Sequence, residues 1–266
     1  MGFCDHSGPL VFAHRGGCAL GPENTITAFD AGAAAGADGL ELDVRLACDG
    51  IVVVHHDPTI ERTTGGRGPV NAMTSAELAR EDAAFRFRPE EGHPLRGRGI
   101  GVPTLPEVLR RYPSLRVIVE MKDDTAALGE AVARDIAAAG AVDRVCAAGF
   151  GARAMTAARA ALPAMATSAR QKEVRIALYR SWIGWPARRL PYGGYQVPER
   201  AGRIRVVSRR FVRHAHRAGL KVQVWTVDEE RDMVRLLDWG VDALISNRPD
   251  LAVEVRDRLN GPRELR

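Results

Sequence analysis

The sequence predicts an α/β protein built as a (β/α)8 barrel. Short apolar runs alternate with amphipathic helical segments along most of the 266 residues, as in parallel sheets with right-handed crossovers. About eight strand–helix units fit this length, which is close to the ~250 residues of a typical single barrel. Polar residues follow the apolar runs, as expected where parallel strands end at a site. An open, doubly wound sheet is the alternative, because no sequence feature proves that the sheet closes.

The first strand is expected where residues 10–12 lead into His14-Arg15-Gly16-Gly17. A helix over 23–36 follows, capped by Asn24 or Thr25 and closed by a glycine. An Asp-Gly turn joins strands expected over 39–46 and 51–56. Runs of Val, Ile and Leu typical of buried parallel strands predict further strands, and the segments between them predict further helices, of which the long Ala-rich one ends at Gly140. These strands are expected over 116–121, 145–149, 165–169, 194–198, 221–227 and 243–246, and the helices over 105–112, 125–139, 152–161, 171–183, 209–218, 229–238 and 250–259.

Residues 58–102 interrupt this alternation. They contain several glycine and proline clusters and one short helical candidate, over 75–80. A long irregular loop inside a compact barrel is usually functional. We therefore expect an insertion that passes over one end of the barrel and partly covers the site. Because no linker or sharp change in composition divides the chain, residues 1–266 are predicted to form one domain that includes this insertion.

Composition limits the classes of partner. The chain has 38 Lys and Arg against 33 Asp and Glu, a net charge of +5, which indicates an anionic substrate or surface. Since no nucleic-acid-binding module accompanies this charge, a nucleic-acid partner is not expected. The four cysteines are scattered without metal spacing, and no secretory signal or membrane-spanning apolar stretch is visible. We therefore expect a cytoplasmic protein, and the sequence leaves its oligomeric state unknown.

Three carboxylates are candidates for a metal site. Glu41 and Asp43 are two residues apart on a predicted strand, so their side chains leave the same face. Two carboxylates this close repel each other unless a cation lies between them. Glu120, at the end of another strand, can supply a third. Oxygen ligands alone suit Mg²⁺ or Ca²⁺ rather than zinc. The alternative is that these acids pair with the many arginines of the chain.

Two histidines and two cations follow strands of the same predicted sheet. His14 and His56 are candidates for a general acid and a general base. Arg15 suits bidentate phosphate binding, and Lys122 would act as a point charge. Two cations, a hard metal ion and two imidazoles together indicate phosphoryl chemistry, in which the cations hold the anion while the imidazoles move protons.

A series of motifs runs in order through residues 11–250, nearly the whole chain. It resembles the glycerophosphodiester phosphodiesterase family, and no motif residue is missing. The motifs are His14-Arg15-Gly16-Gly17, Pro22-Glu23-Asn24-Thr25, Glu41-Leu42-Asp43-Val44, His56-Asp57, Pro103-Thr104-Leu105, Glu120-Met121-Lys122, Trp225-Thr226-Val227 and Ile245-Ser246-Asn247-Arg248-Pro249-Asp250.

The resemblance implies a TIM barrel whose characteristic insertion is residues 58–102. It also implies one divalent metal ion, Mg²⁺ or Ca²⁺ with Mn²⁺ as a third option. The roles that it implies are metal ligands at Glu41, Asp43 and Glu120, acid/base histidines at His14 and His56, phosphate contacts at Arg15 and Lys122, a pocket-lining aromatic at Trp225, and supporting or loop-shaping residues at Glu23 and Asn24.

The family's reaction releases sn-glycerol 3-phosphate and an alcohol from glycerophosphodiesters, within lipid and glycerol metabolism. Some members that this chain resembles instead cleave lysophospholipids, as lysophospholipase D. One histidine would deprotonate the attacking oxygen and the other would protonate the leaving alkoxide. We assign His14 as the acid and His56 as the base. The attacking oxygen stays open between the glycerol 2-hydroxyl and a water molecule at the metal. A non-catalytic phosphate-binding barrel and a membrane-associated barrel are the competing interpretations.

The segment 179–192 is rich in aromatic residues. It holds two of the four tryptophans and two of the four tyrosines, interleaved with three arginines. Val174, Leu178, Trp182 and Trp185 are expected on one face of a helix that ends before Pro186. Trp and Tyr beside Arg are typical of a membrane-interface contact, so we expect a peripheral membrane contact here. The alternative is that this face packs on the barrel.

Overall fold

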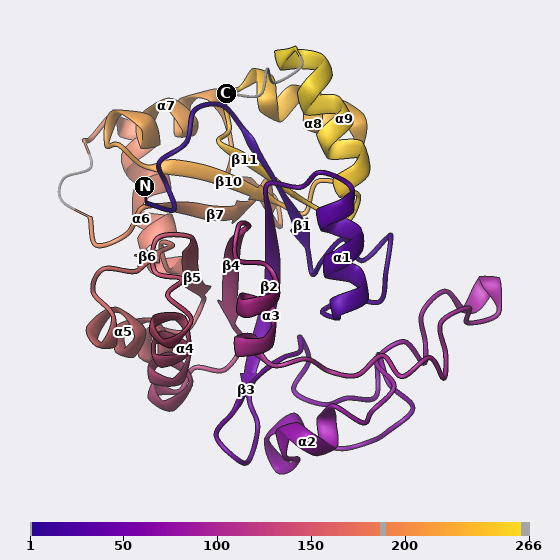
Figure 1. Ribbon diagram of the computed structural model, residues 1–266. Helices are drawn as coiled ribbons and strands as arrows, with labels where there is room; N and C mark the ends of the chain where they lie inside the picture. The colour runs from indigo at the N-terminus through magenta and orange to yellow at the C-terminus, as the bar shows by residue number, and fades with distance from the viewer. Residues whose placement is uncertain (1, 187–189, 262–266) are drawn as a thin grey trace.

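A parallel barrel forms the centre of the molecule (Figure 1). The computed structural model describes residues 2–186 and 190–261, and the side chain of residue 260 is left out of the description. Neighbouring strands pair in the order β6-β5-β4-β2-β1-β11-β10-β7. A parallel bridge between Ser168 and Gly194 joins the two ends of this order, so the predicted barrel is confirmed over the open sheet. The strands are β1 (Leu10–His14), β2 (Gly39–Leu46), β4 (Arg116–Met121), β5 (Val145–Gly149), β6 (Ala166–Thr167), β7 (Gly194–Pro198), β10 (Lys221–Trp225) and β11 (Ala243–Ser246).

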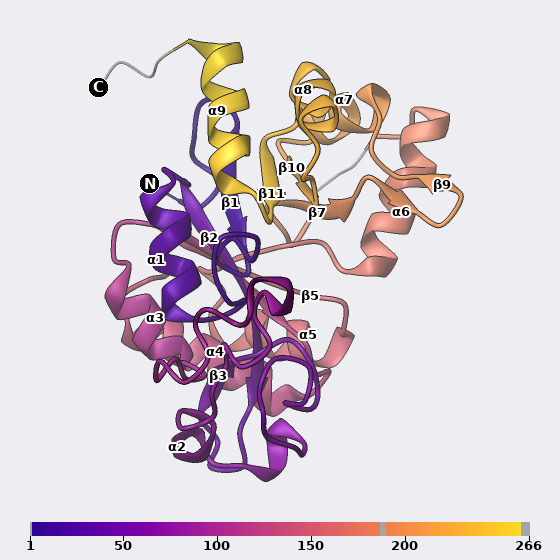
Figure 2. The same ribbon diagram turned by 90° about the vertical axis from the view of Figure 1, so that its right-hand side faces the viewer.

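Helices cover the outside of the barrel, and several begin at the caps that their sequences provide (Figures 1 and 2). The Thr25 side chain accepts the Ala28 N–H at the start of α1, and Thr104 forms a capping box with Glu107 at the start of α3. The helices are α1 (Ile26–Ala34), α3 (Leu105–Arg111), α4 (Ala126–Ala138), α5 (Ala152–Ala161), α6 (Gln171–Ile183), α7 (Arg209–Arg217), α8 (Glu230–Asp238) and α9 (Pro249–Asn260).

The alternation of side chains along β2 decides what faces the interior of the barrel. Leu40, Leu42 and Val44 are completely buried in the core between the strands and the helices. Since neighbouring residues of a strand point to opposite faces, Glu41 and Asp43 must point into the barrel. Below them the interior is filled by an apolar cluster, which includes Phe12, Ile118 and Ile245. The carboxylates therefore lie above an apolar layer.

β3 (Val52–Val54) pairs antiparallel with β2, and it is shorter than the strand predicted over 51–56. β2 and β3 form a hairpin. β2 runs out beyond the barrel, and β3 brings the chain back toward the barrel. The His55 N–H donates to the Asp43 carbonyl at 2.9 Å, so the returning chain reaches the level of the carboxylates. His56 therefore reaches the site on an antiparallel return, not at the end of a parallel strand.

The insertion at 58–102 has its own small core, in which Ile60, Val70, Leu78 and Val102 pack together. It contains η1 (Val70–Ala72), α2 (Ser75–Leu78) and η2 (Pro89–Glu91), and it extends away from the barrel in Figure 1. A second hairpin, formed by β8 (Arg200–Ala201) and β9 (Ile204–Arg205), follows β7 and was not predicted. None of the helices in the described part of the chain has the length and apolarity needed to cross a membrane.

Candidate active site

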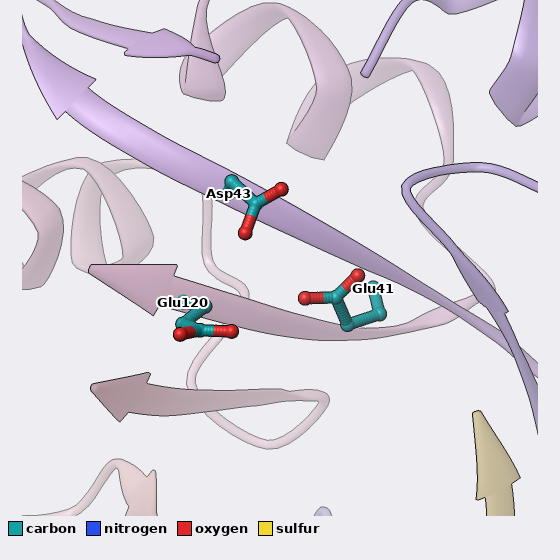
Figure 3. A group of neighbouring side chains, drawn as sticks. All are labelled: Glu41, Asp43 and Glu120. Carbon is teal, nitrogen blue, oxygen red and sulfur yellow. The ribbon is translucent and has the colours of Figure 1, made fainter. Parts of the chain in front are cut away.

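Three carboxylates converge inside the barrel, two from β2 and one from β4 (Figure 3). The two strands are parallel neighbours, and Asp43 lies opposite Glu120 in their register. One oxygen each of Glu41, Asp43 and Glu120 can be chosen so that all three lie within 4.8 Å of one another. Glu41 and Asp43 are only 4% and 1% exposed. The strand spacing that the sequence indicated thus produces a compact, buried cluster of oxygens.

The cluster is electrostatically unfavourable by itself. Burial raises the pKa of Glu41 well above its ordinary value, and the nearby charges of Asp43 and Glu120 raise it further. Burial also raises the pKa of Glu120, although Lys122 opposes this shift. Within residues 2–186 and 190–261, neither a lysine nor an arginine forms an ion pair with Glu41. A cation bound between the carboxylates would relieve this repulsion, so the donor set fits a hard divalent ion.

Two fixed cations flank the cluster. Lys122 Nζ lies 3.2 Å from one oxygen of Asp43 and 3.2 Å from one oxygen of Glu120. Arg15 Nε lies 3.2 Å from the other oxygen of Asp43. Burial alone would raise the pKa of Asp43, but Lys122 and Arg15 hold that pKa below its ordinary value. Among the described residues, the alternative that the acids pair with arginines therefore applies to Asp43, whereas Glu120 pairs with Lys122.

The loop after β1 shapes the site around Asp43. Arg15 and Asn24 both have a left-handed backbone, with φ of 51° and 58°. Asn24 Nδ2 donates to Asp43 at 2.9 Å, and Asn24 Oδ1 accepts the Asp43 N–H at 3.2 Å. Arg15 Nη1 donates to Glu23 at 2.8 Å. Gly16, at φ 89°, allows this loop to lie against α1, where a Cβ would come within 2.8 Å of Ala28.

His14 is held by a neutral partner. Its Nδ1 lies 2.6 Å from Asn247 Oδ1, and Asn247 Nδ2 donates to Asp228 at 2.7 Å. An ionised carboxylate only accepts hydrogen bonds, so Asn247 must turn its oxygen to His14, and Nδ1 must carry the hydrogen. His14 Nε2 then faces Glu41, at 3.8 Å. Burial lowers the pKa of His14, while the hydrogen bond to Asn247 opposes this shift.

His56 is held by a charged partner. Its Nδ1 lies 2.6 Å from Asp57 Oδ1, which leaves Nε2 for a substrate. Arg62, from the insertion, binds the other oxygen of Asp57 and donates two hydrogen bonds to Glu23, at 2.6 and 2.7 Å. Burial would raise the pKa of Asp57, but Arg62 and His56 lower it to about 2. Glu23 thus links the His56 group to Arg15.

Four of these supporting residues had no role in the sequence analysis. Asp57 and Asn247 belong to motifs named above, so their place in those motifs could have marked both as site residues. Asp228 follows the Trp225-Thr226-Val227 motif by one residue, a weak signal. Nothing in the sequence marks Arg62 among the many arginines.

A cavity of about 220 Å³ brings the predicted residues together. Glu23 and Asn24 support its wall from behind. Its lining includes all the predicted catalytic, metal and phosphate residues together with Trp225, namely His14, Arg15, Glu41, Asp43, His56, Glu120, Lys122 and Trp225, and also Ile118, Phe150, Gln196, Thr226 and Ile245.

A second cavity of about 320 Å³ adjoins the first, and its surface is mainly apolar. The two cavities share Glu120, Phe150, Gln196 and Trp225 as lining residues. Val174 and Leu178 of α6 form part of its wall, together with Ala201 and Ile204 of the β8–β9 hairpin and with residues of β7. An apolar space therefore leads directly away from the carboxylates.

The fold and the position of the site define a class of protein. A parallel barrel whose polar residues gather where the strands end at their carboxyl side is typical of (β/α)8-barrel enzymes. The buried carboxylates and fixed cations add a site suited to an anionic substrate.

Comparison with known proteins gives the family. The family model for glycerophosphoryl diester phosphodiesterases matches residues 14–251. A glycerophosphodiester phosphodiesterase of Caldanaerobacter subterraneus is 31% identical, with 92% of this chain and 97% of that protein covered. One from Bacillus altitudinis is 30% identical, with 94% and 98% covered. The chain belongs to the glycerophosphoryl diester phosphodiesterase family, which confirms the family resemblance and the prediction of a phosphodiesterase.

Solved structures agree with this assignment. The glycerophosphoryl diester phosphodiesterase domain of a Mycobacterium tuberculosis protein is 25% identical, with a TM-score of 0.81, and 94% of this chain and all (100%) of that chain are covered. A phosphodiesterase of Oleispira antarctica, solved in complex with the product sn-glycerol-3-phosphate, is also 25% identical. Its TM-score is 0.74, with 94% of this chain and 97% of that chain covered.

Proposed function

We propose that this chain hydrolyses glycerophosphodiesters to sn-glycerol 3-phosphate and an alcohol, with the help of a divalent metal ion. One observation carries the proposal: three carboxylates, two of them buried and one half-buried, line the same cavity as two cations and two imidazoles. The Oleispira antarctica relative, whose structure holds sn-glycerol-3-phosphate, supports the identity of the product. A barrel that only bound phosphate would not need both imidazoles beside the carboxylates.

Glu41, Asp43 and Glu120 would hold the metal ion, which we propose to be Mg²⁺ or Ca²⁺, with Mn²⁺ as a substitute. When bound, such an ion polarises the phosphoryl group and offsets negative charge in the transition state. Arg15 and Lys122 lie at the rim of the carboxylate cluster, where they would bind the non-bridging oxygens of the phosphodiester. Trp225 would pack against the organic part of the substrate.

The two histidines would move the protons. His56 Nε2 takes the proton of the attacking oxygen, which belongs to the glycerol 2-hydroxyl or to a water molecule, as this oxygen bonds to phosphorus, and the Asp57 carboxylate stabilises the positive charge that forms on the ring. Where the 2-hydroxyl attacks, a water molecule must then open the cyclic phosphate to give sn-glycerol 3-phosphate. His14 Nε2 gives a proton to the leaving alkoxide as the old P–O bond breaks. Its hydrogen bond to Asn247 keeps Nδ1 protonated and turns Nε2 toward the carboxylates. The base therefore has a charged partner and the acid a neutral one.

A lysophospholipid is the second candidate substrate. The adjoining apolar cavity, which shares Trp225 and Phe150 with the catalytic cavity, favours an alcohol that carries an acyl chain. A soluble glycerophosphodiester has no group that needs this space. Lysophospholipase D activity would use the same carboxylates, cations and imidazoles, with only the leaving alcohol changed.

A Glu41→Gln variant tests the metal site. It removes the carboxylate that has no basic ion-pair partner, so metal affinity and hydrolysis of glycerophosphocholine should fall together, and added metal should restore part of the rate. Calorimetric titration with Mg²⁺, Mn²⁺ and Ca²⁺ and rates before and after chelation are the measurements. Glu130→Gln, an exposed change on α4, is the control and should behave as the unmodified chain. Unchanged metal dependence in Glu41→Gln would rule out this site.

A further inference from the structure

The outward face of α6 exposes large apolar side chains. Trp182 is 44% exposed, and Ile176, Tyr179 and Ile183 are also exposed. The rings of Tyr179 and Trp182 meet edge to face at 5.2 Å. Single exposed apolar residues are common, but a contiguous group of aromatic and aliphatic side chains on one helix indicates a contact surface. This face therefore needs a partner in solution or at a membrane.

The arrangement corrects the predicted helical stripe. α6 ends at Ile183, and Gly184 follows with φ 73°, so Trp185 lies beyond the helix and is 61% exposed. Val174 and Leu178 line the apolar cavity, whereas Trp182 is turned to solvent. The alternative of a face that packs on the barrel therefore holds for part of the stripe only. Arg188 and Arg189, two of the three predicted arginines of this segment, lie outside the described residues.

The β8–β9 hairpin brings positive charge to the same region. Its residues 200–205 are all exposed, and three of them are arginines: Arg200, Arg203 and Arg205. Ile204, between two of these, is 51% exposed. Lys172 and Arg175 add exposed basic residues on α6. Figure 2 shows the hairpin beside α6, so exposed apolar residues and basic residues share one side of the molecule.

The apolar cavity extends between these two elements. Val174 and Leu178 line the cavity from α6, and Ile204 lines it from the hairpin. The same cavity reaches Glu120 and Trp225 at the catalytic end. A molecule that enters between α6 and the hairpin would therefore reach Glu120 through the apolar cavity.

We propose that the α6 face and the β8–β9 hairpin bind the surface of an anionic lipid bilayer, with the mouth of the apolar cavity turned toward the lipid. Trp and Tyr side chains favour the interface between lipid and water, and each Arg or Lys near an anionic bilayer adds electrostatic attraction. An acidic protein would satisfy the arginines, but it would not account for the cavity that opens between the apolar side chains.

The surface contact is independent of catalysis, but its purpose rests on the proposed function. A phosphodiester whose alcohol carries an acyl chain is anchored in the bilayer by that chain. Exposing the chain to water costs free energy in proportion to its apolar area. A cavity mouth at the membrane surface removes that cost, because the chain passes from lipid into the apolar cavity. The substrate class favoured by this surface is therefore a single-chain lipid phosphodiester.

Flotation with lipid vesicles tests the proposal. The full chain should float with vesicles of phosphatidylcholine and phosphatidylserine, less with phosphatidylcholine alone, and less again in high salt. Arg200→Glu combined with Arg203→Glu should weaken the partition coefficient at least ~10-fold, since each of these basic residues contributes about fivefold. Tyr179→Ala combined with Trp182→Ala should weaken it as well. Circular dichroism should show that these exposed changes leave the fold intact.

Matched controls place the effect on this face. Arg98→Glu combined with Arg110→Glu makes the same charge change on exposed residues of the insertion and of α3, and Ile51→Ala removes an exposed aliphatic residue elsewhere. All three substitutions should leave flotation unchanged. A control charge variant that weakens flotation as much as the hairpin variant would overturn the proposal, because the attraction would then come from net charge alone.

The same variants separate this proposal from the catalytic one. A His56→Ala variant should float as well as the unmodified chain, and the hairpin variant should hydrolyse glycerophosphocholine at the unmodified rate. If the unmodified chain does not hydrolyse glycerophosphocholine, only the proposed function is contradicted. Failure to float with any vesicle, or capture by an acidic protein that competes with vesicles for Arg200 and Arg203, would overturn the membrane contact.

Discussion

The two sides of the catalytic cavity are built from different chemistry. The side formed by β1, β2, β4 and the start of the insertion is a continuous series of charged contacts, from His56 through Asp57, Arg62 and Glu23 to Arg15. The opposite side, formed by α6, β7 and the β8–β9 hairpin, is largely apolar and opens to solvent. The first side is held by short ion pairs and hydrogen bonds, and the second contains an apolar cavity.

This difference matches the two tasks that we propose for the site. Proton transfer and charge stabilisation need groups that are fixed to within a fraction of an ångström, and ion pairs with directional hydrogen bonds provide that order. Selection among alcohols needs only a cavity of suitable shape and polarity. We therefore expect substitutions on the charged side to change the rate for every substrate, and substitutions on the apolar side to change the preference between substrates.

The largest effect is expected from the histidines. His14→Ala and His56→Ala should each lower kcat by ~10²–10⁴-fold, the range for a lost general acid or base. The losses should be less than multiplicative in the double variant, because the two groups act as a unit. A substrate with an acidic leaving alcohol should partly rescue His14→Ala but not His56→Ala. If both variants respond equally to the leaving group, the assignment of acid and base is wrong. His216→Ala, which changes an exposed histidine of α7, is the control.

A smaller effect is expected when His56 loses its charged partner. Asp57→Asn keeps the shape but removes the negative charge, so kcat should fall about 10- to 100-fold while KM changes little. Steady-state kinetics of this variant measure the changes in kcat and in KM separately. Asp49→Asn, in the exposed turn before β3, should leave both constants unchanged. A rise in KM alone would show that Asp57 positions the substrate rather than the imidazole.

The pH dependence follows from the same group. The pKa of Asp57 is lowered from 3.8 to about 2, so the stabilisation from its ion pair is fully present above pH 3.8 and is lost as the pH falls toward 2. The acid limb of the rate profile at milder pH must therefore arise from a group other than Asp57. If that group is the neighbouring His56, Asp57→Asn removes the negative charge that stabilises the protonated ring, so the limb should move to lower pH.

The smallest effect is expected on the apolar side. Val174→Phe should fill part of the apolar cavity and lower kcat/KM for lysophosphatidylcholine about tenfold, while hydrolysis of glycerophosphocholine stays as it is. Competition between the two substrates measures the preference. Ile51→Phe is the matched control. Equal losses for both substrates would mean that the apolar cavity affects the rate for every substrate. The proposed division of tasks between the two sides would then be wrong.

Much of the fold was predictable because the signals are local. The strands over 116–121 and 145–149 and the helix over 171–183 match the observed β4, β5 and α6. Their continuous apolar runs, helical periodicity and flanking glycines are set within each segment. The β8–β9 hairpin was missed because strands of two residues carry no periodicity. β6 was predicted over 165–169 and covers only Ala166–Thr167, since its length depends on its neighbours.

The sequence by itself determined that Glu41 and Asp43 share a face, because side-chain direction along a strand alternates with a period of two. It also determined that His14 lies at the end of a buried strand, because an apolar run leads into it. Only the tertiary structure decided which distant groups meet. His56 reaches the carboxylates through an antiparallel return, and Arg62 of the insertion binds Glu23 beside β1. The apolar cavity likewise forms only when α6 and the β8–β9 hairpin approach each other. Such contacts depend on how the barrel closes, and no local pattern encodes that geometry.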